Sequence, residues 1–253
     1  MLKISVITAS YNNGKTVQQT FDSVLSQTYP MVEYVVIDGC STDGTLQILE
    51  SYRSQLDVLI SEPDDGIYDA LNKGILHSSG DIVGFLHADD LFESRDTLEN
   101  IANAFDIPGV EAVYGDLVYV RKNDTSKIVR YWKSCAFNEK LLYKGWMPPH
   151  PTLYLKRSVY ERLGMFNTQY RIAADYDLIL RFFGEGKLLS AYIPKVLVRM
   201  RNGGVSNKSI KTIIKKSLED ISVLRRNKIG GLLILISKNL FKLKQLIPNL
   251  SQK

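Results

Sequence analysis

The chain has 253 residues, of which 45% are hydrophobic and 23% are charged. This composition excludes a disordered chain, and the length allows one α/β domain with a sizeable core, with or without an appendage. The two cysteines, Cys40 and Cys135, are too few for a disulfide framework and lack metal-binding spacing, which indicates a reducing compartment. The first residues read as a strand rather than a signal peptide, and no apolar run reaches the roughly 18 residues of a spanning helix.

The net charge of +5 is unevenly distributed along the chain. Residues 207–253 carry 11 Lys and Arg against 2 Asp and Glu, a net charge of +9, which leaves 21 against 25, or −4, for residues 1–206. A mildly acidic main body argues against a nucleic-acid-binding protein. The basic C-terminal segment instead indicates docking on an anionic surface.

Residues 1–86 alternate between short apolar runs and segments of helical period. Helical spacing is clearest at Val17, Phe21, Val24 and Leu25, where apolar residues recur at i, i+4, i+7 and i+8. Buried strands are predicted over 4–7, 34–37, 58–60 and 82–86, and helices over 17–25, 46–52 and 68–75. Strands that alternate with helices predict an α/β fold with a parallel sheet and right-handed crossovers.

Three of the predicted strands end in polar clusters, which are Thr8–Asn12, Asp38–Thr45 and His87–Asp90. Each cluster alone is compatible with a turn, a helix cap or a surface acid pair. Ligands of parallel sheets bind at the carboxyl ends of the strands, so three such clusters predict a binding site at one edge of the sheet.

Adjacent carboxylates at Asp89 and Asp90, directly after a buried strand, carry a desolvation and repulsion cost. A hard cation such as Mg²⁺ or Mn²⁺ would offset this cost and would keep substrate phosphates in its shell. The alternative is a plain turn in which Asp89 caps a helix near Thr97. Because the sequence has neither GxGxxG nor GxxxxGK[ST], phosphate binding would depend on a metal at Asp90, assisted by Lys73.

The second half is less regular. Residues 112–120 alternate and predict one or two strands, and three prolines make 146–151 an irregular loop. Asp175 lies in the first turn of a predicted helix, where the helix dipole favours an acid, so it is either a capping residue or a catalytic base. His150, between two prolines, would contact acceptor or phosphate or make a structural hydrogen bond. Arg201 precedes a glycine turn that would either fold over a diphosphate or serve as a linker.

The C-terminal segment keeps helical spacing with lysines between the apolar positions, interrupted at Gly230 and Gly231. A basic amphipathic helix is typical of segments that lie in an anionic membrane interface. The alternative is a helix that packs on the domain or on a second subunit.

Five motifs resemble, in order, the successive blocks of family 2 glycosyltransferases. They are ISVITASYN at 4–12, VVIDGCSTDGT at 35–45, DGIYDALNKG at 65–74, GDIVGFLHADD at 80–90 and ADYDLILR at 174–181. The resemblance implies the GT-A fold, a Rossmann-like α/β domain whose mostly parallel central sheet has helices on both faces, followed by a basic helical tail. Its parts would be a nucleotide-sugar-binding half at 1–115, an acceptor-binding and catalytic half at 116–206, and amphipathic basic helices at 207–253.

The resemblance also implies site residues. The nucleotide-sugar site would be formed by Thr8, Ala9, Tyr11, Asp38, Asp65, Gly66, Asn72, Lys73 and Asp89. Asp38 would accept a hydrogen bond from the base, Asp89 and Asp90 would form the DxD-type metal signature, and Asp175 would be the catalytic base. The sequence departs from the family at Ala9 and Ser10, where many members have proline, and at Ala174, where Glu is frequent before the catalytic Asp.

The resemblance implies a metal-dependent, inverting glycosyltransferase with Mn²⁺ or Mg²⁺. It would move a sugar from a nucleotide-diphosphate sugar, with UDP-sugar favoured, to a hydroxyl of a glycan or lipid-linked oligosaccharide in surface polysaccharide synthesis. It would be cytoplasmic and peripheral to the inner face of the membrane. A sugar nucleotidyltransferase would need a glycine-rich basic loop after the first strand, where only Lys15 is found. A non-catalytic nucleotide- or sugar-binding relative is the other alternative, and the acids at 38, 89, 90 and 175 argue against it.

Overall fold

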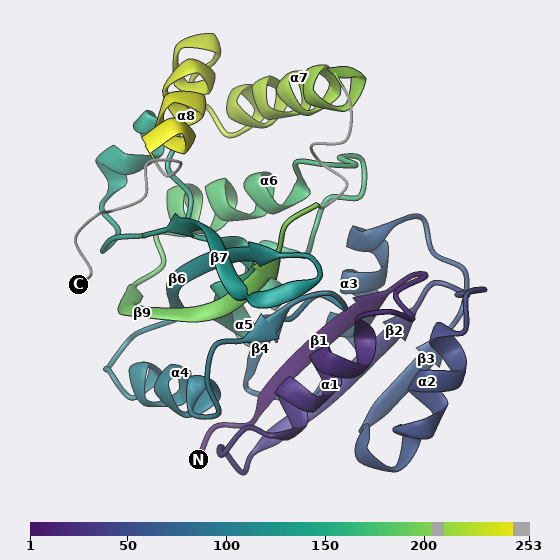
Figure 1. The fold of residues 1–253 in the computed structure, drawn as a ribbon. Coiled ribbons are helices and arrows are strands. Elements are labelled where there is room, and N and C mark those ends of the chain that lie inside the picture. Colours follow the sequence, from purple (N-terminus) through teal and green to yellow (C-terminus); the bar gives the residue numbers. More distant parts are fainter. Residues whose placement is uncertain (204–209, 245–253) are drawn as a thin grey trace.

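The computed structural model of the protein describes residues 1–203 and 210–244, in which helices surround one central sheet (Figure 1). The strands are β1 Ile4–Ser10, β2 Val32–Asp38, β3 Val58–Ser61, β4 Ile82–Phe85, β5 Leu91–Phe92, β6 Ala112–Arg121, β7 Asp124–Trp132, β8 Tyr154–Lys156 and β9 Ser190–Arg201. The α-helices are α1 Val17–Leu25, α2 Thr45–Ser51, α3 Ile67–His77, α4 Thr97–Phe105, α5 Arg157–Leu163, α6 Ala174–Leu180, α7 Ile210–Arg226 and α8 Leu232–Lys244. Short helical turns are η1 Arg53–Gln55, η2 Glu139–Lys144, η3 His150–Thr152 and the π-helical η4 Arg181–Glu185.

The sheet has the strand order β3-β2-β1-β4-β8-β6-β9-β5, with β7 paired to β6. Strands β3, β2, β1 and β4 run parallel, as the alternation of strands and helices predicts. All seven residues of β1 are buried, so both faces of the sheet are covered at its centre. The parallel register sets Ser10 opposite Asp38, and Ile7 opposite Phe85, so the polar segments that follow these strands emerge at the same edge. The predicted GT-A-like α/β fold is confirmed.

The strands of the second half join the same sheet. Strand β6 pairs antiparallel with β8 and β7 and parallel with β9, while β5, from the first half, pairs with β9. Because β5 directly follows the acidic turn after β4, its pairing with β9 places this turn next to the end of β9. The division of the domain into a donor half and an acceptor half stays a prediction.

Strands β5, β7 and β9 are not predicted from the sequence. Pro194 lies inside β9 and breaks the pattern of a regular strand, and the pairing of β6 with β9 shifts register around Gly115 and Asp116. Most of β7 is exposed or half-buried, because it is supported on one edge by β6. Neither β7 nor β9 has the apolar run or the alternation of apolar and polar residues from which a strand is predicted.

The C-terminal segment forms the predicted helices, with a break at Gly230 and Gly231. Helix α7 contacts α6, and α8 contacts α7 and η2, so the two helices form a hairpin over the α6 side of the molecule (Figure 1). The hairpin is held by an ion pair of 2.8 Å between Asp220 and Lys238, both of which are buried. Packing on the domain, the alternative in the sequence analysis, is thus seen in the described residues. No helix within them is both long and apolar enough to cross a membrane.

Candidate active site

The acidic turn after β4 is held in place by helix α1. The Asp90 N–H donates to the carbonyl of His87 at 2.9 Å, which closes the turn. From α1 the hydroxyl of Thr20 donates to the Asp90 carbonyl at 2.8 Å, and from the residue before α1 the Thr16 hydroxyl donates to Ala88 at 3.0 Å. Helix α4 begins at Thr97, and the residue at its N-cap position is Asp96. Asp89 is therefore not the cap of this helix. The backbone of this turn, which carries two adjacent carboxylates, is therefore held in place.

Asp90 is completely buried. Its Oδ1 accepts the Arg201 N–H at 3.1 Å, and its Oδ2 has no hydrogen-bond partner within the described part of the chain. Burial, together with the charge of Asp89, raises the pKa of Asp90 well above its usual value, and burial also raises the pKa of Asp89. An oriented buried carboxylate oxygen without a donor suits a hard cation.

Arg201 lies at the end of β9 and is buried beside the acidic turn. Its guanidinium donates to the Asp89 carbonyl and to the Gln19 side chain, so it is held by the protein on two sides. Burial lowers the pKa of Arg201, which the charges of Asp89 and Asp90 oppose. The predicted contact of Arg201 with phosphate stays a prediction, while its position next to the two acids is a finding.

The second group of polar side chains is centred on Asp175, in the first turn of α6. Its Oδ2 is 3.3 Å from Nδ1 of His150, and the His150 ring lies 5.9 Å from the ring of His87, centroid to centroid. His87 stands three residues before Asp90, so these rings connect Asp175 to the acidic turn. Asp90 and Asp175, which belong to separate motifs of the sequence, therefore lie at one site.

The groups around Asp175 favour its ionised form. Burial raises the pKa of Asp175, but its electrostatic interactions with His150, Lys238 and Lys216 outweigh the effect of burial and leave the pKa below its ordinary value. For His87, burial together with His150 lowers the pKa to about 4. Asp175 is thus a carboxylate, and His87 a neutral imidazole, near neutral pH.

The residues predicted to bind the nucleobase follow β1 and β2. Thr8 is buried and donates to the Leu86 carbonyl at 2.8 Å, and Ala9 is almost buried, whereas Tyr11 is 62% exposed. Asp38 is buried and accepts hydrogen bonds from the Ser41 N–H at 2.9 Å and the Ser61 hydroxyl at 2.8 Å. Tyr11 is the accessible member of this group, and the binding roles stay predictions.

The residues predicted to lie along the nucleotide surround the start of α3. Asp65 and Gly66 are exposed, and Gly66 has a φ of 111°, which favours glycine. The Asn72 side chain binds the backbone of Phe166 through two hydrogen bonds of 2.9 and 3.0 Å. The Nζ atom of Lys73 is 2.8 Å from Oε1 of Glu62 and 3.5 Å from Oδ2 of Asp69. Asn72 and Lys73 thus have protein partners that a nucleotide would need to share.

Two tyrosines at the site are not predicted from the sequence. The Tyr68 hydroxyl donates to the Ile172 carbonyl at 2.8 Å and lies 3.4 Å from Oδ1 of Asp175. Burial raises the pKa of Tyr119; the charge of Arg130 opposes that rise, and the charges of Asp90 and Asp175 add to it. No periodicity or motif marks either tyrosine as a site residue, because contacts across the fold bring them to the site.

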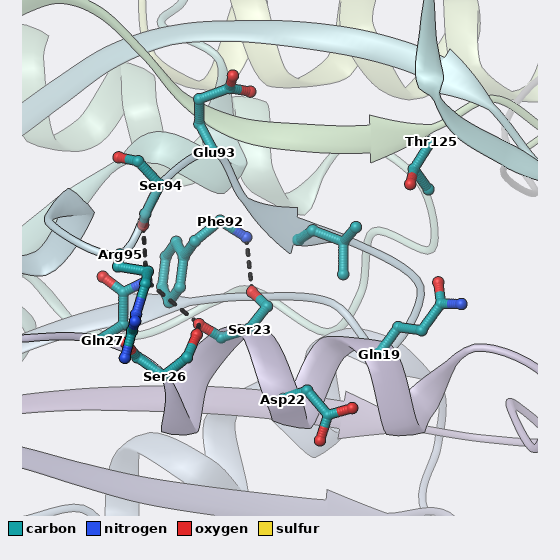
Figure 2. Close-up of a pocket in the computed structure, with 11 residues that line it drawn as sticks. Gln19, Asp22, Ser23, Ser26, Gln27, Phe92, Glu93, Ser94, Arg95 and Thr125 are labelled. Atoms are coloured by element: carbon teal, nitrogen blue, oxygen red, sulfur yellow. Dashed lines mark hydrogen bonds between the residues drawn. The ribbon is translucent and has the colours of Figure 1, made fainter.

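A groove of about 530 Å³ lies beside the acidic turn, between α1 and residues 91–95 (Figure 2). The Ser23 hydroxyl accepts the Phe92 N–H at 2.8 Å across it, and Gln19 stands at its edge. Asp89, Asp90 and Asp175 do not line it. Gln19 accepts a hydrogen bond from Arg201 and so links the groove to the site.

Comparison with known proteins identifies the family of the chain. The sequence profile of Glycosyl transferase family 2 matches residues 5–169. The chain is 31% identical over 218 residues to a PGL/p-HBAD biosynthesis glycosyltransferase of Mycobacterium bovis, covering 84% of this chain and 80% of that protein.

Two solved structures share the fold. S. aureus TarS in complex with UDP-GlcNAc has a TM-score of 0.69 at 18% identity, covering 96% of this chain and 73% of TarS. The mannosyltransferase PcManGT of Pyrobaculum calidifontis, in complex with GDP-Man and Mn²⁺, has a TM-score of 0.67 at 22% identity, covering 96% and 71%. The protein is a glycosyltransferase, and its chain belongs to glycosyl transferase family 2.

Proposed function

We propose that this glycosyltransferase moves a sugar from a nucleotide-diphosphate sugar, a UDP-sugar in preference, to a hydroxyl of a glycan or lipid-linked oligosaccharide. The reaction is metal-dependent and inverts the anomeric carbon. The observation that carries the proposal is the meeting of the Asp89–Asp90 turn with Asp175 and His150 at one edge of the sheet. The nucleotide sugars in the TarS and PcManGT complexes support the donor class.

The acids fit a divalent cation that shares its ligands with the substrate. Asp90 offers a buried carboxylate oxygen without a hydrogen-bond donor among the described residues, and Asp89 offers a second carboxylate next to it. In the described ranges, 1–203 and 210–244, no group of three or more His, Cys, Asp or Glu could hold the ion alone. Asp89 and Asp90 would hold Mn²⁺ or Mg²⁺ together with water and the diphosphate, and the charge of the ion would stabilise the leaving group.

Asp175 is the base in this proposal. Its carboxylate is ionised at neutral pH and accepts the proton of the acceptor hydroxyl as the oxygen attacks the anomeric carbon and the bond to the diphosphate breaks. The Tyr176 N–H, 2.8 Å from Oδ1, holds the carboxylate, and His150 faces Oδ2. Fixing both substrates at one edge of the sheet supplies much of the remaining acceleration.

The C-terminal hairpin supports an acceptor at a membrane surface, as in O-antigen, capsule or exopolysaccharide synthesis at the inner face of the cell membrane. Its two helices expose several large apolar side chains, which are Ile213, Ile214, Leu218, Leu232, Leu233, Ile236 and Leu240. Exposed cations lie on the same helices and the turn between them, at Lys215, Arg225, Arg226 and Lys228. Apolar side chains flanked by cations suit an interface of anionic lipid.

The test is calorimetry with UDP, GDP, CMP and dTDP, each with and without Mn²⁺. Metal-dependent binding of one diphosphate by the wild type, lost in Asp90→Ala and retained in Asp106→Ala, which removes an exposed acid, would support the donor site. Binding of no nucleotide, or equal binding by Asp90→Ala, would contradict it. Donor hydrolysis without acceptor, measured as nucleotide release from UDP-Glc, UDP-GlcNAc and GDP-Man, then reports turnover.

A further inference from the structure

The segment that leads into α6 is held by a residue from the C-terminal hairpin. Glu219, on α7, accepts three backbone N–H groups through its carboxylate: Ile172 at 2.8 Å, Ala173 at 3.0 Å and Arg171 at 3.3 Å. Ala173, the residue before α6, has no side-chain acceptor of its own. The carboxylate that holds this segment therefore comes from 46 residues later in the chain.

The same segment contacts the start of α3, where the donor is proposed to bind. The Ile172 carbonyl accepts the Tyr68 hydroxyl at 2.8 Å, and the Arg171 guanidinium donates to the carbonyl of Asp65. Tyr68 in turn lies 3.4 Å from Asp175. The segment 171–173 thus leads directly into the turn that carries Asp175, and it also binds the Tyr68 hydroxyl that lies next to the Asp175 carboxylate.

Helix α7 is itself fixed against α6 by further contacts. Asn227 donates to Oδ1 of Asp177 at 3.2 Å, and Lys238, paired with Asp220, lies 3.2 Å from the centroid of the Tyr176 ring. These contacts fix where Glu219 stands relative to the first turn of α6. A carboxylate on a rigid helix is able to orient the residues that it binds.

We infer that Glu219 is a positioning residue for Asp175: its carboxylate binds the N–H groups of residues 171–173 and so orients the base and Tyr68 for proton transfer. The inference rests on the proposed role of Asp175. It makes the C-terminal hairpin part of the active site rather than an appendage for localisation alone. Glu219 lies outside the residues that match the family profile, which end at 169.

The test uses the full-length chain with Glu219→Ala and Glu219→Gln, with Glu161→Ala, an exposed acid on α5, as the matched control. Glu219→Ala is expected to lower kcat for donor hydrolysis about 10- to 100-fold, because a small displacement of a base costs that much. Nucleotide affinity should be nearly unchanged, and thermal stability should fall only by the loss of these hydrogen bonds. Glu219→Gln should retain most of the turnover, since its amide oxygen still accepts N–H groups. Amides 171–173 should exchange with deuterium at least about tenfold faster in Glu219→Ala.

The outcomes separate this inference from the proposed function. If Asp175→Asn abolishes turnover while Glu219→Ala keeps it, the positioning role is wrong and the base assignment stands. If Asp175→Asn retains turnover, the base assignment fails and the positioning role fails with it. A Glu219→Ala protein that loses nucleotide affinity and thermal stability together with kcat would show a general structural role and would also overturn the inference.

Discussion

Replacing Lys238 with methionine tests the buried ion pair that closes the C-terminal hairpin. The Lys238 ammonium is 2.8 Å from Asp220 and 3.2 Å from the centroid of the Tyr176 ring, and the side chain is 3% exposed. Methionine keeps an apolar stem of similar length and removes the charge. The substitution therefore leaves the Asp220 carboxylate buried with its cation removed.

The expected cost follows from these contacts. Removing one partner of a buried pair typically costs about 3–5 kcal/mol, because the other charge stays desolvated. The contact with the Tyr176 ring adds about 2 kcal/mol, since the cation is already desolvated. We expect Lys238→Met to lower the free energy of unfolding by about 5–7 kcal/mol, and Asp220→Asn/Lys238→Met to recover more than about 1 kcal/mol of that loss.

Urea unfolding followed by circular dichroism measures both variants, with the exposed Lys215→Met as a control that should stay within about 0.5 kcal/mol of wild type. Turnover gives a second readout. Lys238 lowers the pKa of Asp175, so its removal should move the acid limb of kcat to higher pH. A loss below about 1 kcal/mol, or a double variant less stable than Lys238→Met, would refute the reasoning.

Four further results are expected. Asp175→Asn should lower donor hydrolysis roughly 10²- to 10⁴-fold with unchanged nucleotide affinity by calorimetry, and a surviving kcat would exclude it as the base. Leu233→Ser, at an 82% exposed position, should weaken cosedimentation with phosphatidylglycerol vesicles about tenfold, whereas equal binding would remove this helix face from the interface. Gly145→Ala should lower the melting temperature, because φ at this position is 73° and the added Cβ would lie 2.6 Å from the Cβ of Lys238. A melting temperature equal to that of the wild type would contradict so close an approach of Gly145 to α8. Burial raises the pKa of Glu33, but Lys3, Ser5 and Ser79 bring it to about 2 from 4.5. Its contribution of up to about 3 kcal/mol is present above pH 4.5 and lost as the pH falls toward 2, and urea unfolding of Glu33→Gln should lack this loss.

The parallel half of the fold could be predicted because its strands are buried on both faces. Strands β1, β2 and β4 read as apolar runs, and each ends in a polar cluster that the structure brings to one edge. The acidic turn and Asp175 were found for the same reason: each stands at the end or start of a recognisable element. Sequence spacing could not show that His150 bridges them, because the irregular loop around η3 sets its position.

The remaining parts of the site depend on contacts between distant segments. Tyr68 reaches Asp175 only because the segment before α6 folds against α3, and Gln19 reaches Arg201 only through the pairing of β5 with β9. No local sequence pattern predicts these contacts, since a tyrosine on the exposed face of a helix and a tyrosine at an active site can have the same spacing from their neighbours. Strand β9, interrupted by Pro194, was missed for a related reason: its pairing with β6 outweighs its weak local preference.

The acids and the exposed cations of the C-terminal hairpin lie in different surroundings. Residues 207–253 contain only two acids, Glu219 and Asp220, and both have partners within the protein: Glu219 binds the segment before α6, and Asp220 pairs with Lys238 of the same hairpin. Lys238, counted in the sequence among the basic charges, is buried and does not contribute to the surface. The exposed charges described on this hairpin, such as Lys215 and Arg225, are therefore positive. The inner face contacts the segment before α6, which leaves exposed apolar and basic side chains for the proposed contact with an anionic surface.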